Sequence, residues 1–351
     1  HLIGKNLFPI DQKSSAHRKI LLEYFQIKYE TNELLKELPQ ELSQNSPKAH
    51  KTELRLQTLN NHMLDLQPDT EEIIETYITQ VIRTEKIPFQ LGDVVFPPVD
   101  IALDRLPSLL IISPRDRIEN IEQVLLRPNI PFPEREALEN HISLNEDLSA
   151  LVSGIGGIST YPAIVSSNDL ASTISSASHE WLHNHLFLRP LGQNYNRSAD
   201  MASINETVAN IFATEVRNSV LTQLGIQVPI EIPRTGDSTC SSMEFCFNNE
   251  MHQTRLEVDK LLELGKVDEA ETFMEKRRQI FVEHGYFIRK LNQAYFAFHG
   301  TYADSPASIS PLYDQILQFR QTFQSLGGFI RSIERVSNYD AFYSMSQHLS
   351  D

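Results

Sequence analysis

The spacing of apolar residues changes along the chain and divides it into three regions. From residue 15 to about residue 86, apolar side chains recur every three or four positions with charges between them, which predicts amphipathic helices. The segment "NSPKAH" supplies one break and "LQPDTEE" a second, with Asp69 or Thr70 as an N-cap. We therefore expect a helical hairpin or three-helix unit, of architectural character, in an N-terminal region spanning residues 1–92.

Residues 93–230 form a middle region with a different pattern. Short apolar runs at 99–103 and 108–113 are separated by proline-containing turns and predict strands. Helical spacing follows at 116–126 and 134–142. This region therefore mixes strands with helices.

A β-rich piece at 158–165 follows a glycine-rich bend. Glycines beside a strand let another backbone approach closely, so we expect an edge strand that can pair with an extended peptide. A helix is predicted from 170 to about 187, with Asn168 or Asp169 as its N-cap, and a second helix from about 203 to 224.

The C-terminal region, residues 231–351, has helical spacing through most of its length. Helices are predicted at 243–264, 267–284, 287–298 and 311–335. Taken together, the three regions predict an α+β protein that is predominantly α-helical.

Composition and charge narrow the classes of partner. The 351 residues include 40% hydrophobic and 22% charged residues, which is typical of a soluble globular protein. The net charge of −15 and the lack of a Lys/Arg-rich run argue against nucleic acid as a partner, because a phosphate backbone requires a basic surface. No apolar stretch approaches the roughly 20 residues of a membrane span.

The localisation is less constrained. The chain begins at His1 without a methionine, so an N-terminal signal or membrane anchor could be missing. Cys240 and Cys246 flank "SSMEF" and form either a small disulfide loop, which suggests an oxidising compartment, or two reduced side chains. Their spacing does not match a four-ligand zinc motif. These features slightly favour an extracytoplasmic or membrane-tethered setting over a cytoplasmic one.

The strongest chemical signal is "HEWLH", residues 179–183, inside the predicted helix 170–187. Helix residues four apart differ by about 40° around the axis, so His179 and His183 present their imidazoles on one face. Two imidazoles at this spacing can bind one Zn²⁺. Glu180, about 100° further round, can reach a water molecule beside the metal without being a ligand. The pattern indicates a Lewis acid beside a general base.

A catalytic zinc needs a third protein ligand, and "INETVAN" supplies Glu206 as a candidate. Glu206 lies 23 positions after His183, on the next predicted helix, after a loop long enough to bring the two helices side by side. The alternative is a capping box, S-x-x-E, in which Ser203 and Glu206 satisfy the end of their own helix. The upstream histidines favour the ligand interpretation.

The motifs "HEWLH" and "NETVAN" resemble those of the gluzincin zinc metallopeptidases, the thermolysin-like clan. The resemblance covers residues 155–216. It implies a zincin-like catalytic core, a small sheet with an active-site helix, flanked by the N- and C-terminal helical regions. It also implies Zn²⁺ as the cofactor, held by His179, His183 and Glu206.

Two further site residues follow from the same resemblance. Asn210 stands four positions after Glu206, where the family has an acidic or amide residue that orients the first histidine; the amide oxygen can accept from an imidazole but lacks the carboxylate's charge. Tyr195, in the loop between the motifs, stands near the place of a tyrosine that helps to stabilise the oxyanion in these enzymes.

Hydrogen-bond donors and aromatic residues are dense in "FIRKLNQAYFAFHGTYADSP". One interpretation is that this helix forms the other wall of a cleft, with His299 as first choice, or Tyr302, donating to a developing oxyanion. The other is an amphipathic helix with snorkelling polar ends. His185 lies on a different face of the helix from His179 and His183 and is expected to be structural or solvent-facing.

These residues predict a zinc metallopeptidase that acts on peptide or protein substrates, with Glu180 as general base and Tyr195 and His299 stabilising the oxyanion. A second possibility is a non-catalytic helical scaffold or binding protein with a structural or vestigial zinc site, although such a site has no use for a base at Glu180. A third is a metallohydrolase of non-peptide amides or esters. The acidic balance favours neutral or basic substrates through long-range steering.

Overall fold

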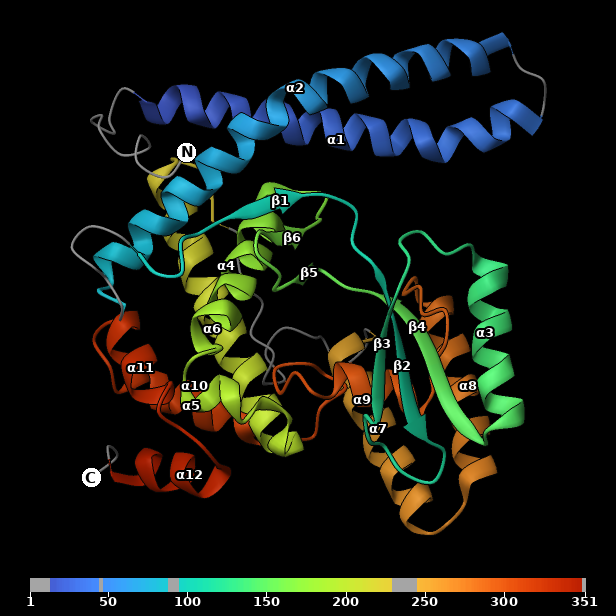
Figure 1. Ribbon diagram of the computed structural model, residues 1–351. Helices are drawn as coiled ribbons and strands as arrows, with labels where there is room; N and C mark the ends of the chain where they lie inside the picture. The colour runs from blue at the N-terminus through green and yellow to red at the C-terminus, as the bar shows by residue number, and fades with distance from the viewer. Residues whose placement is uncertain (1–12, 44–46, 88–94, 229–244, 349–351) are drawn as a thin grey trace.

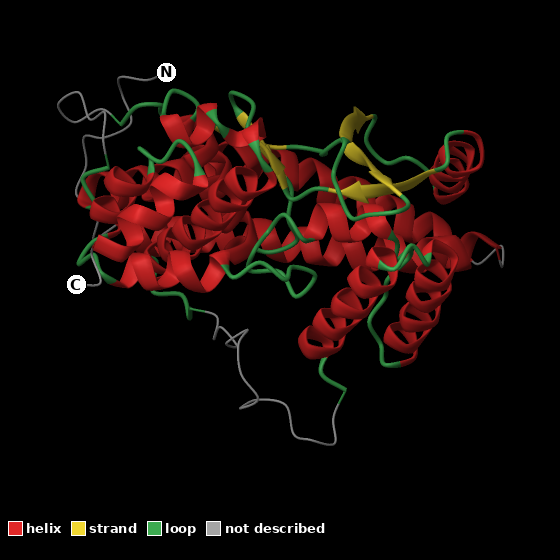
Figure 2. Cartoon of the chain, turned by 90° about the horizontal axis from the view of Figure 1, so that it is seen from below, coloured by secondary structure: helices red, strands yellow, loops and turns green. Residues whose placement is uncertain are grey.

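A computed structural model of the protein describes residues 13–43, 47–87, 95–228 and 245–348. Over these residues the fold is α+β and predominantly helical, with two small three-stranded sheets. Helices make up most of the molecule, and the sheets lie near each other along one side (Figure 2). The predicted boundaries between the three regions, at 92/93 and 230/231, fall outside the described residues.

The N-terminal region is a hairpin of two long helices, α1 (Lys13–Ser43) and α2 (Pro47–Thr84), which crosses the top of Figure 1. α2 continues through Pro68, so the predicted break at "LQPDTEE" is wrong. Proline inside a helix costs about 3 kcal/mol. The apolar face that follows it, with Ile74 and Tyr77 at most 2% exposed, offsets that cost because each large apolar side chain contributes about 2 kcal/mol when buried.

The first sheet has the order β1-β6-β5. β1 (Ile101–Leu103) runs parallel to β6 (Ala163–Val165), and β5 (Gly157–Ile158) is antiparallel to β6. The segment 158–165, predicted as one edge strand, is therefore parts of β5 and β6, and of these two strands only β5 lies at an edge of the sheet.

Side chains of α2 cap the outer edge of β1. The Glu75 carboxylate accepts from the backbone N–H of Ile101 at 3.0 Å, and the Glu71 carboxylate accepts from that of Leu103 at 2.7 Å. The Gln67 amide donates to the Leu103 carbonyl at 3.0 Å. Since these residues are spaced by four, one stripe of the helix replaces a missing neighbouring strand.

The first lobe, on the left of Figure 1, is built around two long helices, α4 (Leu170–Leu186) and α6 (Ala199–Gln223). One apolar core joins them to the hairpin, to the first sheet and to the C-terminal helices α10 (Leu312–Gln321), α11 (Leu326–Ile333) and α12 (Tyr339–His348). The predicted helix 311–335 is thus two helices. The end of the chain returns to the lobe in which the chain began.

The second lobe, on the right of Figure 1, contains an antiparallel sheet of order β3-β2-β4. Its strands are β2 (Ser108–Pro114), β3 (Glu122–Leu126) and β4 (Leu148–Gly154). The helix predicted at 116–126 is wrong, because its second half pairs with the fully buried β2 as a solvent-exposed strand. Helices complete this lobe: α3 (Phe132–Asn145), α7 (Phe247–Glu263), α8 (Val267–Glu283) and α9 (Gln293–His299).

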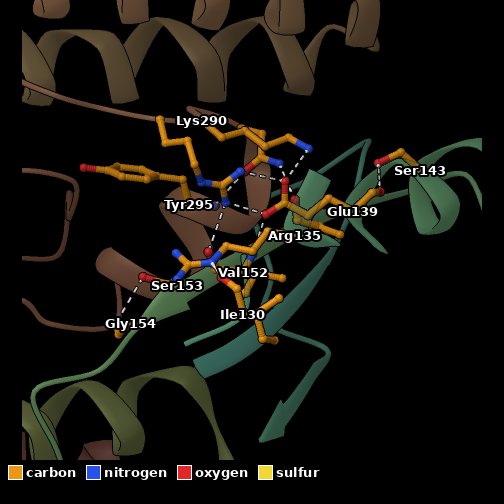
Figure 3. Close-up of polar contacts among 12 residues, drawn as sticks. Ile130, Arg135, Glu139, Ser143, Val152, Ser153, Gly154, Lys290 and Tyr295 are labelled. Carbon is orange, nitrogen blue, oxygen red and sulfur yellow. Dashed lines mark hydrogen bonds and ion pairs between the residues drawn. The ribbon is translucent and has the colours of Figure 1, made fainter. Parts of the chain in front are cut away.

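A buried carboxylate joins three elements of the second lobe (Figure 3). Glu139 on α3 is 1% exposed and accepts from the Val152 N–H on β4 at 2.6 Å, from Arg289 Nη1 at 2.9 Å and from Lys290 Nζ at 3.2 Å. Burial alone would raise the pKa of Glu139, but these partners outweigh it and hold the pKa below its ordinary value. The network fixes the segment that leads into α9.

Among the described helices, none is long and apolar enough to cross a membrane. Cys246, just before α7, is disulfide-bonded. Cys240 lies outside the described residues.

Candidate metal centre

The helix α4 presents "HEWLH" with one face toward α6 and the other toward the core. It begins as predicted, because the Asp169 side chain accepts from the Ser172 N–H at 2.8 Å. Trp181 and Leu182 are at most 3% exposed, and the Trp181 indole donates to the Pro97 carbonyl at 2.9 Å. Burial of this face fixes the rotation of the helix and so the direction of its ligand face.

A tight return brings the chain from α4 to α6 through α5 (Pro190–Gln193) and the 3₁₀ turn η1 (Tyr195–Arg197). A Cβ added at Gly192 would lie 2.1 Å from the Leu186 carbonyl oxygen, so only glycine allows this close approach. α4 and α6 then lie side by side, as expected from the loop length (Figure 1).

The N-cap of α6 is Ser198, whose hydroxyl accepts from the Met201 N–H at 3.2 Å. Ser203 therefore lies inside the helix, and its buried hydroxyl has no hydrogen-bond partner among the residues that the structure describes. The capping box with Glu206 is not formed, which leaves the Glu206 carboxylate free to face α4.

Three side chains converge between the two helices. His179 Nε2 and His183 Nε2 are 2.9 Å apart, and Glu206 Oε2 lies 3.2 Å from the first and 3.6 Å from the second. This group could hold a metal ion. Tetrahedral ligands about 2.1 Å from a metal are about 3.4 Å apart, close to these separations. Glu206 Oε2 is moreover buried and faces both imidazole nitrogens, so an ionised oxygen is directed at the point that a cation would occupy.

The electrostatics of the group favour positive charge. Burial alone would raise the pKa of Glu206, but the charge of His183 and hydrogen bonds from both histidines hold it well below its ordinary value. Burial alone would lower the pKa of His183, but Glu206 outweighs this and raises it. An ionised carboxylate in a buried site attracts a cation, whether a proton on imidazole or a metal.

The Glu180 side chain lies beside this group but is not one of the three candidate ligands. The residue is 8% exposed, and burial raises the pKa of its carboxyl group although both histidines act in the opposite direction. A carboxylate with a raised pKa beside a ligand cluster is suited to accept and return a proton near neutral pH.

The hydrogen bonds of Tyr195 and Asn210 differ from those that the family resemblance implies. The Tyr195 hydroxyl donates to Glu206 Oε1 at 2.7 Å, which orients the candidate ligand. The Asn210 amide donates to the Asp304 carboxylate at 3.0 Å, a contact that links α6 to the second lobe. Asn205, which the motif reading missed, lies beside His183 and favours its protonated form.

The candidate site lies in an open cleft of about 1360 Å³ lined by both lobes. His299 and Tyr302, at and after the end of α9, line this cleft together with the metal-ligand candidates. Burial lowers the pKa of His299 to about 4, so its imidazole is neutral at pH 7, and its ring packs on that of Tyr295. Burial, and after it the charges of Glu206 and Glu180, raise the pKa of Tyr302 well above its ordinary value.

Other hydrogen-bond donors of the segment 287–306 make their contacts inside the second lobe and not in the cleft. α9 begins at Gln293 and not at 287, so Arg289 and Lys290 precede it and bind Glu139. Asn292 caps the helix and donates to the Ala150 carbonyl at 2.9 Å. These contacts position α9, at and beyond whose end His299 and Tyr302 line the cleft.

Searches of protein-family models, of curated proteins and of solved structures find no match. The resemblance to gluzincins therefore rests on the two motifs alone.

His185, the third histidine of α4, is structural. Its side chain is fully buried, its Nε2 lies 3.0 Å from Glu334 Oε2, and its ring stacks on Trp181 with centroids 5.3 Å apart. The Glu334 carbonyl also accepts from the Leu191 N–H at 3.2 Å. This contact ties the return between α4 and α6 to the C-terminal helices.

Proposed function

We propose that the protein is a zinc-dependent metallopeptidase. The observation that carries the proposal is the convergence of His179, His183 and Glu206 on one point of an open cleft, with the buried carboxylate of Glu180 on the same wall. Two imidazoles and a carboxylate form a donor set of catalytic zinc sites, which leave a further position open. The same donor set also binds iron in some oxygenases. The adjacent carboxylate favours hydrolysis and thus zinc.

Zinc at this site would supply Lewis acidity, which polarises a carbonyl group and makes water more acidic. Glu180 takes the proton from the attacking water, and its raised pKa lets it return that proton to the leaving amine. The Tyr195 hydroxyl holds the Glu206 carboxylate in place during the reaction by donating to Oε1, the oxygen that does not face the histidines.

The opposite wall of the cleft stabilises the negative charge that develops on the substrate oxygen. Burial and the neighbouring carboxylates keep Tyr302 protonated, so its hydroxyl can donate. The neutral imidazole of His299 is a second donor in the same cleft. Tyr302 takes the role first assigned to Tyr195, since the Tyr195 hydroxyl is already bound to Glu206.

The substrate of this proposal is an extended stretch of polypeptide. The cleft is open to solvent, and the edge strand β5 lines it beside Glu180. An edge strand can bind the backbone of an extended chain by β-addition. α4, α6 and the small sheets would correspond to the zincin-like core. The disulfide at Cys246 supports an extracytoplasmic location.

The test is hydrolysis of a broad peptide library by the zinc-loaded protein. Activity that a chelator abolishes and added zinc restores supports the proposal. Cleavage confined to non-peptide amides or esters would shift the substrate class and keep the metal chemistry. A protein that binds no zinc and cleaves nothing would instead be the helical scaffold considered from the sequence.

A further inference from the structure

The strand β5 lies against the face of α4 that carries the candidate base. A Cβ added at Gly157 would lie 2.5 Å from Glu180 Oε1, 2.7 Å from its Cγ and 2.9 Å from its Cδ. Real Cβ atoms essentially never approach other atoms this closely. The Gly157 backbone and the Glu180 side chain therefore occupy neighbouring volumes with no room for a methyl group between them.

No described residue makes a hydrogen bond to the Glu180 carboxylate, although those of Glu206, Glu139 and Glu71 all accept such bonds. The groups that act on its pKa are burial and the charges of His179, His183 and Glu206. Its lone pairs are therefore available to a water molecule or a leaving amine. Its position must come from packing, and the Gly157 backbone is one neighbour so near that an added Cβ would overlap the carboxylate.

The backbone at Gly157 does not itself require glycine. Positive φ angles among the described glycines occur at Gly225, Gly265 and Gly285. A Cβ at the adjacent Gly156 would meet the Ser176 hydroxyl at 3.5 Å, an ordinary contact. Space beside Glu180 is thus the feature that distinguishes Gly157 from its neighbour.

The strand that carries Gly157 is held from behind. Gly157 pairs with Val165 and Ile158 with Ile164 of β6, and β6 pairs with β1, whose outer edge is capped by α2. The Ser166 N–H also donates to the Gly156 carbonyl at 3.4 Å. These contacts limit the movement of β5 away from α4, so the strand can act as a fixed stop for the carboxylate.

We propose that Gly157 is a positioning residue for Glu180: the bare backbone of β5 sets where the carboxylate stands relative to the ligand cluster. The inference rests on the proposed function, since Glu180 is a base only if the protein is a hydrolase. A base must stand within about 3 Å of the proton that it takes, and a misplacement of about 1 Å can lower the rate about 100-fold. A close-fitting strand meets this demand and leaves the carboxylate oxygens free.

The structural test compares crystal structures of the Gly157→Ala and Gly156→Ala variants with that of the parent protein. We expect the Glu180 carboxylate to be displaced in Gly157→Ala and unmoved in Gly156→Ala. A Gly157→Ala structure in which Glu180 keeps its position and β5 moves away would overturn the proposal. This result does not depend on whether the protein is a peptidase.

A stability cycle covers the case in which Gly157→Ala alone folds poorly. The contact predicts that Gly157→Ala lowers the melting temperature in the parent protein and has a much smaller effect in a Glu180→Ala background, where the obstructing side chain is gone. Equal losses in both backgrounds would show that the added methyl group meets something other than Glu180.

The kinetic test separates positioning from substrate binding. With zinc bound, Gly157→Ala should lower kcat about 10- to 100-fold with KM and zinc stoichiometry unchanged, while Gly156→Ala stays near the parent value. In a Glu180→Gln background, Gly157→Ala should cause no further loss. A raised KM with unchanged kcat would show that the added methyl group disturbs substrate binding by β5 and not the position of Glu180, and would reject the positioning role. A parent protein without peptidase activity would refute the proposed function. The crystal structures of the variants would still show whether Gly157 sets the position of Glu180.

Discussion

Glu206 has partners on both of its carboxylate oxygens. Oε2 faces His179 and His183, and Oε1 accepts from the Tyr195 hydroxyl. The carboxylate is therefore oriented so that one oxygen is directed at the point where the imidazole nitrogens meet. A phenol that holds a ligand acts on the affinity for the metal, whereas a phenol across the cleft acts on the reaction.

The two tyrosines of the cleft should therefore separate in their effects. Tyr195→Phe removes the 2.7 Å hydrogen bond to Glu206 and should weaken zinc affinity about 10-fold, measured by competition with a chromophoric chelator. Tyr302→Phe should leave zinc affinity unchanged and lower kcat about 100-fold, because it removes a donor to the developing negative charge. The reverse pattern would show that their roles have been exchanged.

The ligand candidates could be predicted from the sequence because they depend on helix geometry. Positions four apart share one helix face, so helix geometry alone places His179 and His183 side by side on the same face. Tyr302 could be named only as an alternative to His299, since its place depends on a loop that ends α9 and on the packing of two lobes. Nothing in the spacing indicates that Asp304 would bind Asn210.

At the scale of single elements, the cap of α2 on β1 shows how a helix can protect a sheet edge. Glu71→Ala leaves the Leu103 N–H without its acceptor, and we expect a loss of about 1–3 kcal/mol in the free energy of unfolding, measured with urea. Glu72→Ala, one position along the same helix and exposed to solvent, should change stability by less than about 0.5 kcal/mol. Equal effects of the two changes would mean that the cap does not contribute to stability.

The buried Glu139 makes the second lobe sensitive to acid. Its pKa is below the ordinary value of 4.5 in the folded protein, so its stabilising contribution is present above that pH and is lost as the pH falls through the folded value. Glu139→Gln should cost about 3–5 kcal/mol at neutral pH, because Arg289 and Lys290 lose their charged partner. Between about pH 6 and about pH 3 the variant should lose less stability than the parent protein.

The control for this comparison is Glu136→Gln on the same helix, an exposed position that should leave the pH profile unchanged. Unfolding free energies measured at each pH for the three proteins test the prediction. Parallel curves of unfolding free energy against pH for Glu139→Gln and the parent protein would contradict the role of the buried Glu139 carboxylate.

Two elements were predicted wrongly for one reason, which is that tertiary contacts outweigh local preference. Pro68 favours the end of a helix, but the apolar face of α2 beyond it is buried in the core. Residues 122–126 carry no clear strand alternation, yet they become β3 because β2 offers a partner edge. Neither the core nor the partner is visible in a local window of sequence.

At the scale of the whole molecule, the site lies between two lobes that do not follow the order of the chain. The first lobe combines the N-terminal hairpin with α4, α6 and α10 to α12. The second lobe combines β2 to β4 with α3 and α7 to α9. Periodicity identified most of the helices but not which of them share a core. The three consecutive regions expected from the sequence therefore differ from the lobes, and α9 reaches the cleft from the second lobe.

In the proposed function, Glu180 acts as a base beside a zinc held by His179, His183 and Glu206. The most direct test measures zinc content and peptide hydrolysis on the same preparation of the Glu180→Gln variant. We expect one zinc per chain, as in the parent protein, and a fall in kcat of about 1000-fold, because the amide cannot accept the proton. Undiminished hydrolysis by the zinc-loaded variant would contradict the mechanism.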